Sequence, residues 1–344
     1  MLTSTKNAIR WSRDIALAKL SLHRRSYRNH SITVLTYHRV LSANYPDIAT
    51  AEPGMVVMDR TFDMHMQLLS RELQVLPLAN WIDRVAEGKD IPAHAAAVTF
   101  DDGWADNYHY AFPILKKYTV PATIFLVSDF VGTRMQFWPE RLMRALRHIA
   151  ATRAGSKING DGSMGAWFAE ITKGISPVDC TYDREDFAII VERAKRWSDD
   201  QNHNFLDQLA ITVRFDESQQ APDLLDWAQV KEMSGSGLVD FGSHTRRHVR
   251  LGDSTDSDTL HDEVVESRRI IAAGVGADAR LFCYPNGDRS AMADQLVQQN
   301  YVGGCTTQQG WNDAATDPFE IKRITMHDGN SSSPHEFLAR LSGL

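Results

Sequence analysis

Cysteine is scarce in this 344-residue chain. Its three cysteines, Cys180, Cys283 and Cys305, lie far apart and form no CxxC pair. An odd number of cysteines at such spacing predicts neither a disulfide framework nor a cysteine zinc site. A reducing compartment is therefore the simpler expectation.

The chain also lacks an excess of positive charge and any long apolar run. Its net charge is −7 and its isoelectric point is near 6.0, whereas nucleic-acid-binding proteins usually carry a basic surface that neutralises phosphates. The longest apolar run near the start is Ile15 to Ala18, while a membrane span needs about 20 residues and a signal-peptide core about 7 to 15. We expect no nucleic-acid partner, signal peptide or transmembrane helix, and a cytoplasmic location.

Residues 1–30 depart from this acidic balance, because their only acidic residue is Asp14 among several lysines and arginines. Apolar residues recur here at alternating spacings of three and four: Ala8, Trp11, Ile15, Ala18 and Leu22. This pattern predicts a basic amphipathic helix. The helix either docks on the rest of the domain or lies against a partner or an anionic membrane surface. The last alternative predicts peripheral contact with the inner face of a membrane.

From residue 31 onwards, short apolar runs alternate with helical patterns, which predicts a parallel α/β fold. The predicted strands are 31–36, 95–100, 121–127, 238–242, 281–284 and 301–305. The predicted helices are 62–72, 108–118, 225–233, 260–273 and 291–300. The stretch at about 139–222 has a looser helical pattern and many charges, so it predicts a mostly helical insertion between two strands.

Two adjacent carboxylates, Asp101 and Asp102, directly follow the predicted strand 95–100. The carboxyl end of a strand is where α/β barrels keep their active sites. One carboxylate can bind a metal while the other acts as a general base, and Gly103 allows the backbone to turn sharply. Taken alone, the pair is better explained as a cap of the helix that starts near Trp104.

A pair of histidines changes that balance, because His244 and His248 follow the predicted strand 238–242. In a helical turn, a spacing of four puts both imidazoles on one face, where they can hold the same ion. Such a pair alone is weak evidence, since surface helices contain it by chance. Together with a strand-terminal aspartate it supplies two nitrogens and one oxygen and leaves positions open for water and substrate. The combination predicts a metal site.

These segments resemble the polysaccharide deacetylase family, also described as the NodB homology domain or carbohydrate esterase family 4. TFDDG at 99–103 and HTRRH at 244–248 match two of its motifs residue for residue. YHRV at 37–40 and PATIF at 121–125 are similar to two further segments, and FCYPNG at 282–287 is similar to a third motif. The resemblance covers most of residues 31–342 apart from the insertion.

The resemblance implies an α/β fold, a distorted (β/α) barrel of the NodB type with a mostly helical insertion. It implies that Asp101 is the general base. It also implies that Asp102, His244 and His248 bind a divalent metal, with Zn²⁺ as the first expectation and other divalent ions as alternatives.

The third motif departs from the family pattern, since Cys283 and Asn286 stand where the family has an arginine and a tyrosine. In the family, the backbone N–H of that tyrosine helps to bind the oxyanion, a role that Asn286 can also perform. The missing arginine affects the orientation and low pKa of Asp101. Arg280 and Arg323 are the candidate substitutes.

The family's last motif supplies a histidine as general acid. Residues 323–328 match this motif loosely, which implies His327 as the acid, with a solvent-exposed turn as the alternative. His38 follows the first predicted strand and can also reach the site. Trp311 corresponds either to the family's pocket tryptophan or to an ordinary core residue.

The resemblance implies a hydrolase of carbon–nitrogen bonds other than peptide bonds. The expected reaction is N-deacetylation of an N-acetylated sugar in a polysaccharide or glycan precursor. One alternative is a deformylase or another amidohydrolase that acts on a lipid-linked sugar. Another is a catalytically weakened carbohydrate-binding protein of polysaccharide assembly, which the departures at Cys283 and Asn286 keep open. Retention of Asp101 beside a full ligand set argues against it, since a binding protein needs no free base.

Overall fold

The computed structural model describes residues 14–15, 31–45, 48, 51–92, 95–158, 162–179, 181–217 and 223–341. The predicted N-terminal helix, apart from Asp14 and Ile15, and Cys180 lie outside the described residues. Across the described ranges, no helix has both the length and the apolar character needed to cross a membrane. The chain forms two compact units, one of residues 1–43, 54–133 and 224–344, the other of residues 44–53 and 134–223.

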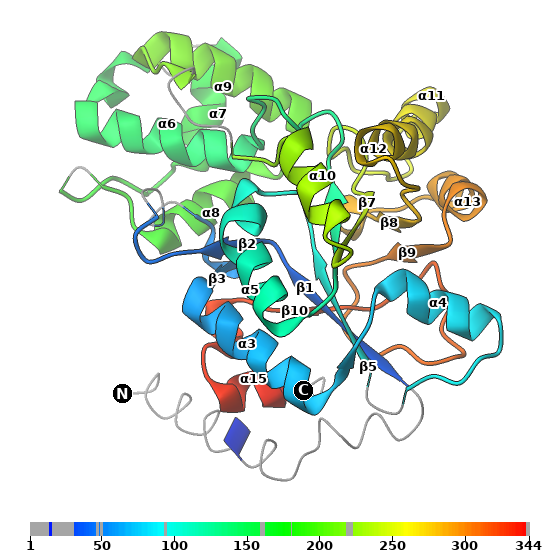
Figure 1. Cartoon of the computed structure of the whole chain (residues 1–344). Coiled ribbons are helices and arrows are strands. Elements are labelled where there is room, and N and C mark those ends of the chain that lie inside the picture. The colour runs from blue at the N-terminus through cyan, green and yellow to red at the C-terminus, as the bar shows by residue number, and fades with distance from the viewer. Residues whose placement is uncertain are drawn as a thin grey trace. The chain divides into compact units, whose positions relative to one another are not determined.

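The larger unit is built on a parallel sheet (Figure 1). Its strands follow the order β10-β1-β5-β6-β7-β8-β9, with β4 beside β5. The strands are β1 (Ile32–Tyr37), β4 (Gln74–Val75), β5 (Ala95–Phe100), β6 (Ala122–Leu126), β7 (Val239–Ser243), β8 (Leu281–Cys283), β9 (Gly303–Cys305) and β10 (Ile324–Thr325). The segment 321–324 contacts strands near both ends of the sheet. Ile321 forms a bridge with Cys305 of β9, and Ile324 of β10 pairs with Leu35 of β1. The sheet is a distorted, incompletely closed barrel, which confirms the predicted fold class.

Strands β1 and β5 are buried along their whole length, as expected for parallel strands covered on both faces. Their side chains alternate between two apolar clusters. Leu35 and Val98 belong to one cluster, and Val34 and Ala97 belong to the other. Because side chains alternate along a strand, Asp101 continues the face of Ala97. Asp101 therefore lies on the same face of the sheet as the cluster that contains Val34 and Ala97.

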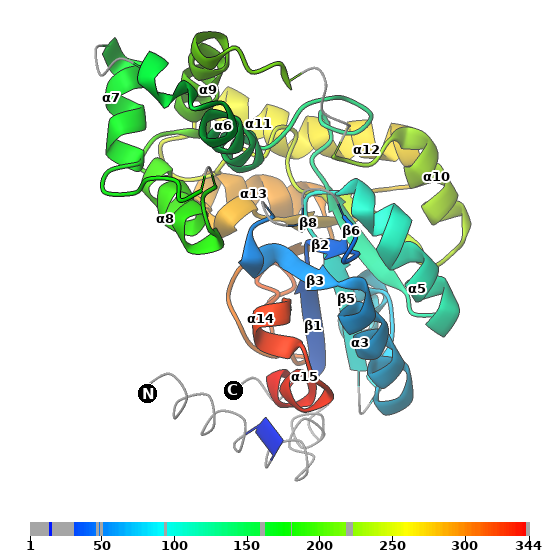
Figure 2. The ribbon, with the colours of Figure 1, turned by 90° about the vertical axis from the view of Figure 1, so that its left-hand side faces the viewer.

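Helices of the same unit cover the sheet, with α3 and α5 side by side (Figures 1 and 2). The helices are α3 (Asp59–Glu72), α4 (Leu78–Ala86), α5 (Phe112–Tyr118), α10 (Trp227–Gly235), α11 (Ser257–His261), α12 (Ser267–Val275), α13 (Ala291–Asn300), α14 (Asp328–Ser331) and α15 (Pro334–Arg340). The π-helical segments η4 (Asn107–Ala111) and η7 (Asp262–Glu266) precede α5 and α12. The helix predicted at 260–273 is thus three consecutive segments.

The smaller unit is helical (Figure 2). It has its own apolar core. It contains α6 (Trp138–Thr152), η5 (Ala154–Lys157), α7 (Gly162–Ile171), α8 (Arg184–Ala194) and α9 (Asp199–Val213). Its core includes Leu146, Trp167 and Leu209. The side chains of Asp183 and Ser198 cap the first turns of α8 and α9. The region predicted as a mostly helical insertion is helical.

Candidate active site

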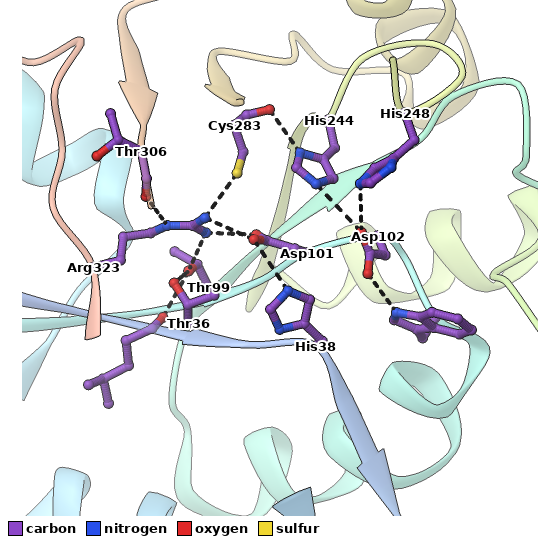
Figure 3. Close-up of polar contacts among 12 residues, drawn as sticks. Thr36, His38, Thr99, Asp101, Asp102, His244, His248, Cys283, Thr306 and Arg323 are labelled. Carbon is purple, nitrogen blue, oxygen red and sulfur yellow. Dashed lines mark hydrogen bonds and ion pairs between the residues drawn. The ribbon is translucent and has the colours of Figure 1, made fainter. Parts of the chain in front are cut away.

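Polar side chains gather where several strands of the larger unit end, as Figure 3 shows. His38 follows β1, Asp101 and Asp102 follow β5, and His244 follows β7. Cys283 is the last residue of β8. Because the carboxyl ends of parallel strands meet at one edge of the sheet, segments far apart in the sequence meet at this edge.

Asp102, His244 and His248 form a group whose ligand atoms all lie within 4.8 Å of one another. Asp102 Oδ1 lies 3.5 Å from His244 Nε2 and 3.6 Å from His248 Nε2. Ligands bound at about 2.0–2.2 Å to one tetrahedral ion are separated by roughly 3.3–3.6 Å. The spacing of the three side chains therefore fits a divalent metal such as Zn²⁺.

Neighbouring groups prepare two of these ligands for a metal. The Cys283 carbonyl accepts a hydrogen bond of 2.8 Å from His244 Nδ1, so the proton is on Nδ1 and Nε2 keeps its lone pair. Burial lowers the pKa of His244 to about 4 despite the nearby Asp101 carboxylate, so this ring is neutral at pH 7. The Trp104 indole donates a 2.9 Å hydrogen bond to Asp102 Oδ2. Asp102 Oδ1 thus faces the histidines.

The backbone turns sharply at both motifs. Asp102 and Gly103 both have φ of 76°, and a Cβ at Gly103 would lie 2.7 Å from Leu126 Cδ2. Thr245 and His248 both have φ of 64°. The helical turn predicted for the histidine pair is therefore wrong, because residues in the left-handed region interrupt a right-handed helix. The loop still brings the two imidazole centroids to 5.0 Å.

Asp101 forms a bidentate ion pair with Arg323, with N–O distances of 2.7 and 2.8 Å. Each side chain is about 95% buried. Burial by itself raises the pKa of Asp101, but the charge and hydrogen bonds of Arg323 hold it well below its usual range. Of the two candidate substitutes for the family arginine, Arg323 contacts the aspartate, whereas Arg280 pairs with Asp83.

Cys283 lies beside this ion pair. Its sulfur is 3.1 Å from Arg323 Nη2, and Arg323 Nε donates to the Thr306 carbonyl. Burial raises the pKa of the Cys283 thiol, so a neutral thiol stands at the position of the family arginine. The guanidinium comes instead from the residue just before β10.

His38 is a further neighbour of Asp101, in addition to Arg323. Its Nε2 lies 3.9 Å from Asp101 Oδ2 (Figure 3). Sequence reasoning gave it little weight because an isolated histidine is more often structural. One signal was available: His38 continues the face of β1 that carries Thr36, just as Asp101 continues the face of Thr99.

The structure places His327 two positions after the end of β10, at the edge of the sheet where β1 ends. Thr325 pairs with Thr36, so continuing that register by two residues brings His327 level with His38. The backbone N–H of His327 donates to Asn330 Oδ1 at 3.0 Å. Both histidines therefore follow adjacent strands, His38 after β1 and His327 after β10.

Asn286 follows β8 in the short turn Pro285–Gly287, where it is exposed and has φ of 55°. Trp311 packs partly buried against the main apolar core and donates from its indole to the Leu341 carbonyl. The core alternative for Trp311 therefore agrees with its contacts.

Trp104 is a site residue to which sequence reasoning assigned no role. It is buried, and the guanidinium of Arg39 lies 4.2 Å from its ring centroid. Arg39 Nε in turn donates to Asp106 Oδ2 at 2.9 Å. Its position two residues after Asp102 was the only available signal. Asp106, Arg39, Trp104 and Asp102 are thus linked by successive contacts. They form a buried network that ends at the candidate metal ligand Asp102.

Comparison with known proteins identifies relatives for part of the chain. A family model described as polysaccharide deacetylase matches residues 88–152 and 190–302, just over half of the chain. The putative polysaccharide deacetylase YxkH of Bacillus subtilis is 29% identical over 118 residues, 34% of this chain. A poly-beta-1,6-N-acetyl-D-glucosamine N-deacetylase of Staphylococcus epidermidis is 32% identical over 115 residues, 31% of this chain. The aligned region spans 39% of the length of each relative.

Two solved structures share the fold over most of both chains. The Streptococcus pyogenes deacetylase PplD in complex with acetate has a TM-score of 0.57 and 20% identity, covering 88% of this chain and 95% of that one. IcaB from Ammonifex degensii has a TM-score of 0.55 and 18% identity, covering 91% and 97%. At these identities the similarity establishes the fold.

Proposed function

Since this chain belongs to the polysaccharide deacetylase family, we propose that it removes the acetyl group from an N-acetylated sugar of a polysaccharide or glycan precursor. The observation that carries the proposal is the set of Asp102, His244 and His248, spaced for one metal ion, beside the buried carboxylate of Asp101. The relatives named as poly-beta-1,6-N-acetyl-D-glucosamine deacetylases make N-acetylglucosamine units the first substrate to test.

In this proposal Asp102, His244 and His248 hold the divalent metal. When bound, such an ion polarises the acetamido carbonyl and lowers the pKa of water from about 15.7 towards about 7. Asp101 accepts the proton of the attacking water. Arg323 binds both oxygens of Asp101, which fixes the plane of the carboxylate and keeps it ionised.

Charge also develops on the substrate oxygen during attack. We keep Asn286 as the source of a backbone N–H for this oxyanion, because it lies three positions after Cys283, the last residue of β8, and a backbone N–H needs no particular side chain. Its side chain is not required for this role, so Asn286→Gly, which keeps the N–H and readily adopts the φ of 55°, should retain activity.

The departing nitrogen must gain a proton, and two histidines are candidates for the donor. His327 is the residue that the family resemblance implies. His38 is the second candidate because its Nε2 lies 3.9 Å from Asp101, close to the carboxylate that takes up a proton in the first step. Substituting each in turn distinguishes them.

The test is acetate release from a panel of N-acetylated sugars and oligosaccharides by the full-length chain, together with its metal content. Wild type should release acetate and contain about one divalent ion per chain. Asp102→Ala should lose both the metal and the activity. A metal-free wild-type protein would contradict the metal site, and release of formate from N-formyl sugars without acetate release would favour the deformylase alternative.

A further inference from the structure

The loop that joins His244 to His248 has no helical hydrogen bonds of its own to hold it, because Thr245 and His248 adopt left-handed conformations. Its backbone groups instead bind neighbouring segments. His244 N–H donates to the Leu126 carbonyl, and the Thr245 carbonyl accepts from Ser267 Oγ. Since buried backbone groups need partners, the conformation of this loop depends on the groups around it.

Two N–H groups in the middle of the loop have a single acceptor. Arg246 N–H and Arg247 N–H donate to the same oxygen, Oε2 of Glu263, at 2.9 and 2.8 Å. The other oxygen of Glu263 accepts from Arg247 Nε at 2.7 Å. One carboxylate therefore binds the backbone of both residues at the centre of the loop.

The Glu263 side chain is fully buried. A carboxylate removed from water is costly unless charge and hydrogen bonds compensate for the lost hydration. The three donors described above supply that compensation. Glu263 belongs to η7, a π-helical segment between α11 and α12, and π-bulges occur frequently at functional sites. The helix places this carboxylate against the loop although 15 residues separate Glu263 from His248 in the sequence.

We propose that Glu263 is a positioning residue, whose carboxylate holds the loop so that His244 and His248 face Asp102 at metal-binding distances. This inference rests on the proposed function, since it concerns the ligands of the proposed metal. Glu263 acts through the backbone and does not touch the metal ligand atoms. Groups that orient metal ligands typically change metal affinity by about 10- to 100-fold when they are removed.

The test compares Glu263→Gln with Asp262→Asn in the full-length chain. Gln has the volume of Glu, but it cannot accept at both oxygens, so at least one of the three donors loses its partner. Asp262 is the adjacent carboxylate and also faces both arginines, but through their side chains: it pairs with Arg246 and with Arg247 Nη2. The control therefore removes a neighbouring negative charge and leaves the backbone contacts of Glu263 intact.

The readout is binding of Co²⁺ to the metal-free proteins, followed by visible absorption, with thermal melting measured without metal. Glu263→Gln should bind Co²⁺ about 10- to 100-fold more weakly than wild type and shift its absorption bands. Asp262→Asn should match wild type. Saturating Co²⁺ should raise the melting temperature of wild type more than that of Glu263→Gln.

The inference is overturned if Glu263→Gln binds Co²⁺ as wild type does, even where its melting temperature falls, because Glu263 then only stabilises the fold. It is also overturned if Asp262→Asn weakens binding equally, since a general charge effect explains that result. If Glu263→Gln does not fold, Glu263→Asp keeps the charge, shortens the side chain and is judged by the same comparison. A wild-type chain that fails to bind Co²⁺ overturns the proposed function as well.

Discussion

Replacing Arg323 by methionine tests the ion pair that surrounds the proposed base. Methionine retains much of the apolar stem of Arg323 but removes the guanidinium, which leaves Asp101 buried without its partner. Removing one partner of a buried ion pair typically destabilises a protein by about 3–5 kcal/mol. At about 2.1 cal/mol/K of unfolding entropy per residue, that loss lowers the melting temperature of this 344-residue protein by roughly 4–7 °C.

The same substitution should change the pH dependence of activity. In wild type, Arg323 holds the pKa of Asp101 below its usual range. The ion pair therefore stabilises the fold at pH values above the usual pKa of an aspartate. This contribution is lost as the pH falls through the depressed pKa. In Arg323→Met, the largest effect that opposes burial is removed, so the pKa of Asp101 rises. The acidic limb of the activity profile should therefore move to higher pH, and the loss of stability relative to wild type should shrink towards acid pH.

The assay is acetate release from pH 4 to pH 9, together with thermal melting across the same range. Arg280→Met is the matched control, since it removes the half-exposed pair with Asp83, which should cost about 0–1 kcal/mol and leave the acidic limb in place. Arg323→Lys keeps the charge and serves if Arg323→Met does not fold. An unchanged acidic limb in folded Arg323→Met would refute the role assigned to this pair.

Three further predictions concern the proposed roles. His244→Ala should abolish metal binding, whereas Asp101→Asn should retain the metal and lose turnover; elemental analysis with acetate release checks both, and a fully active Asp101→Asn excludes this base. Replacing the true proton donor, His327 or His38, by glutamine should leave metal content unchanged, lower turnover by about 100-fold and remove the alkaline limb; two substitutions without effect exclude both. Residues 1–30 should bind anionic vesicles more weakly as salt increases, and their deletion should leave the chemistry intact; an unfolded or aggregated deletion variant would show instead that this segment belongs to the core.

The sequence was most informative where a buried strand runs directly into the site. Residues 95–100 form a strand with the predicted bounds, because a continuous apolar run followed by two aspartates is a strong local pattern. Strands β3 (Val56–Met58) and β10 are too short to show a period, and neither was predicted. The pairing of β2 (Arg39–Leu41) with β3 was missed for the same reason. Strands β8 and β9 have only three residues each, but they lie within the predicted segments 281–284 and 301–305.

Contacts between distant segments account for the remaining differences. The spacing of His244 and His248 predicted a helical turn, but the loop geometry depends on Glu263, which belongs to a separate helical segment. Similarly, the sequence left Arg280 and Arg323 as alternatives, because local patterns do not show which cation reaches Asp101. Only the position of β10 beside β1 decides between them.

The separation between Asp101 and Arg323 has a consequence for biosynthesis. Arg323 is the 222nd residue that the ribosome adds after Asp101. At about 5–20 residues per second, this interval lasts roughly 10 to 45 seconds. By the end of that time the nascent chain contains Asp102, His244 and His248, but its carboxylate at position 101 still lacks the Arg323 guanidinium. The catalytic apparatus is therefore completed only after Arg323 has been added and the segment that forms β10 joins the sheet beside β1.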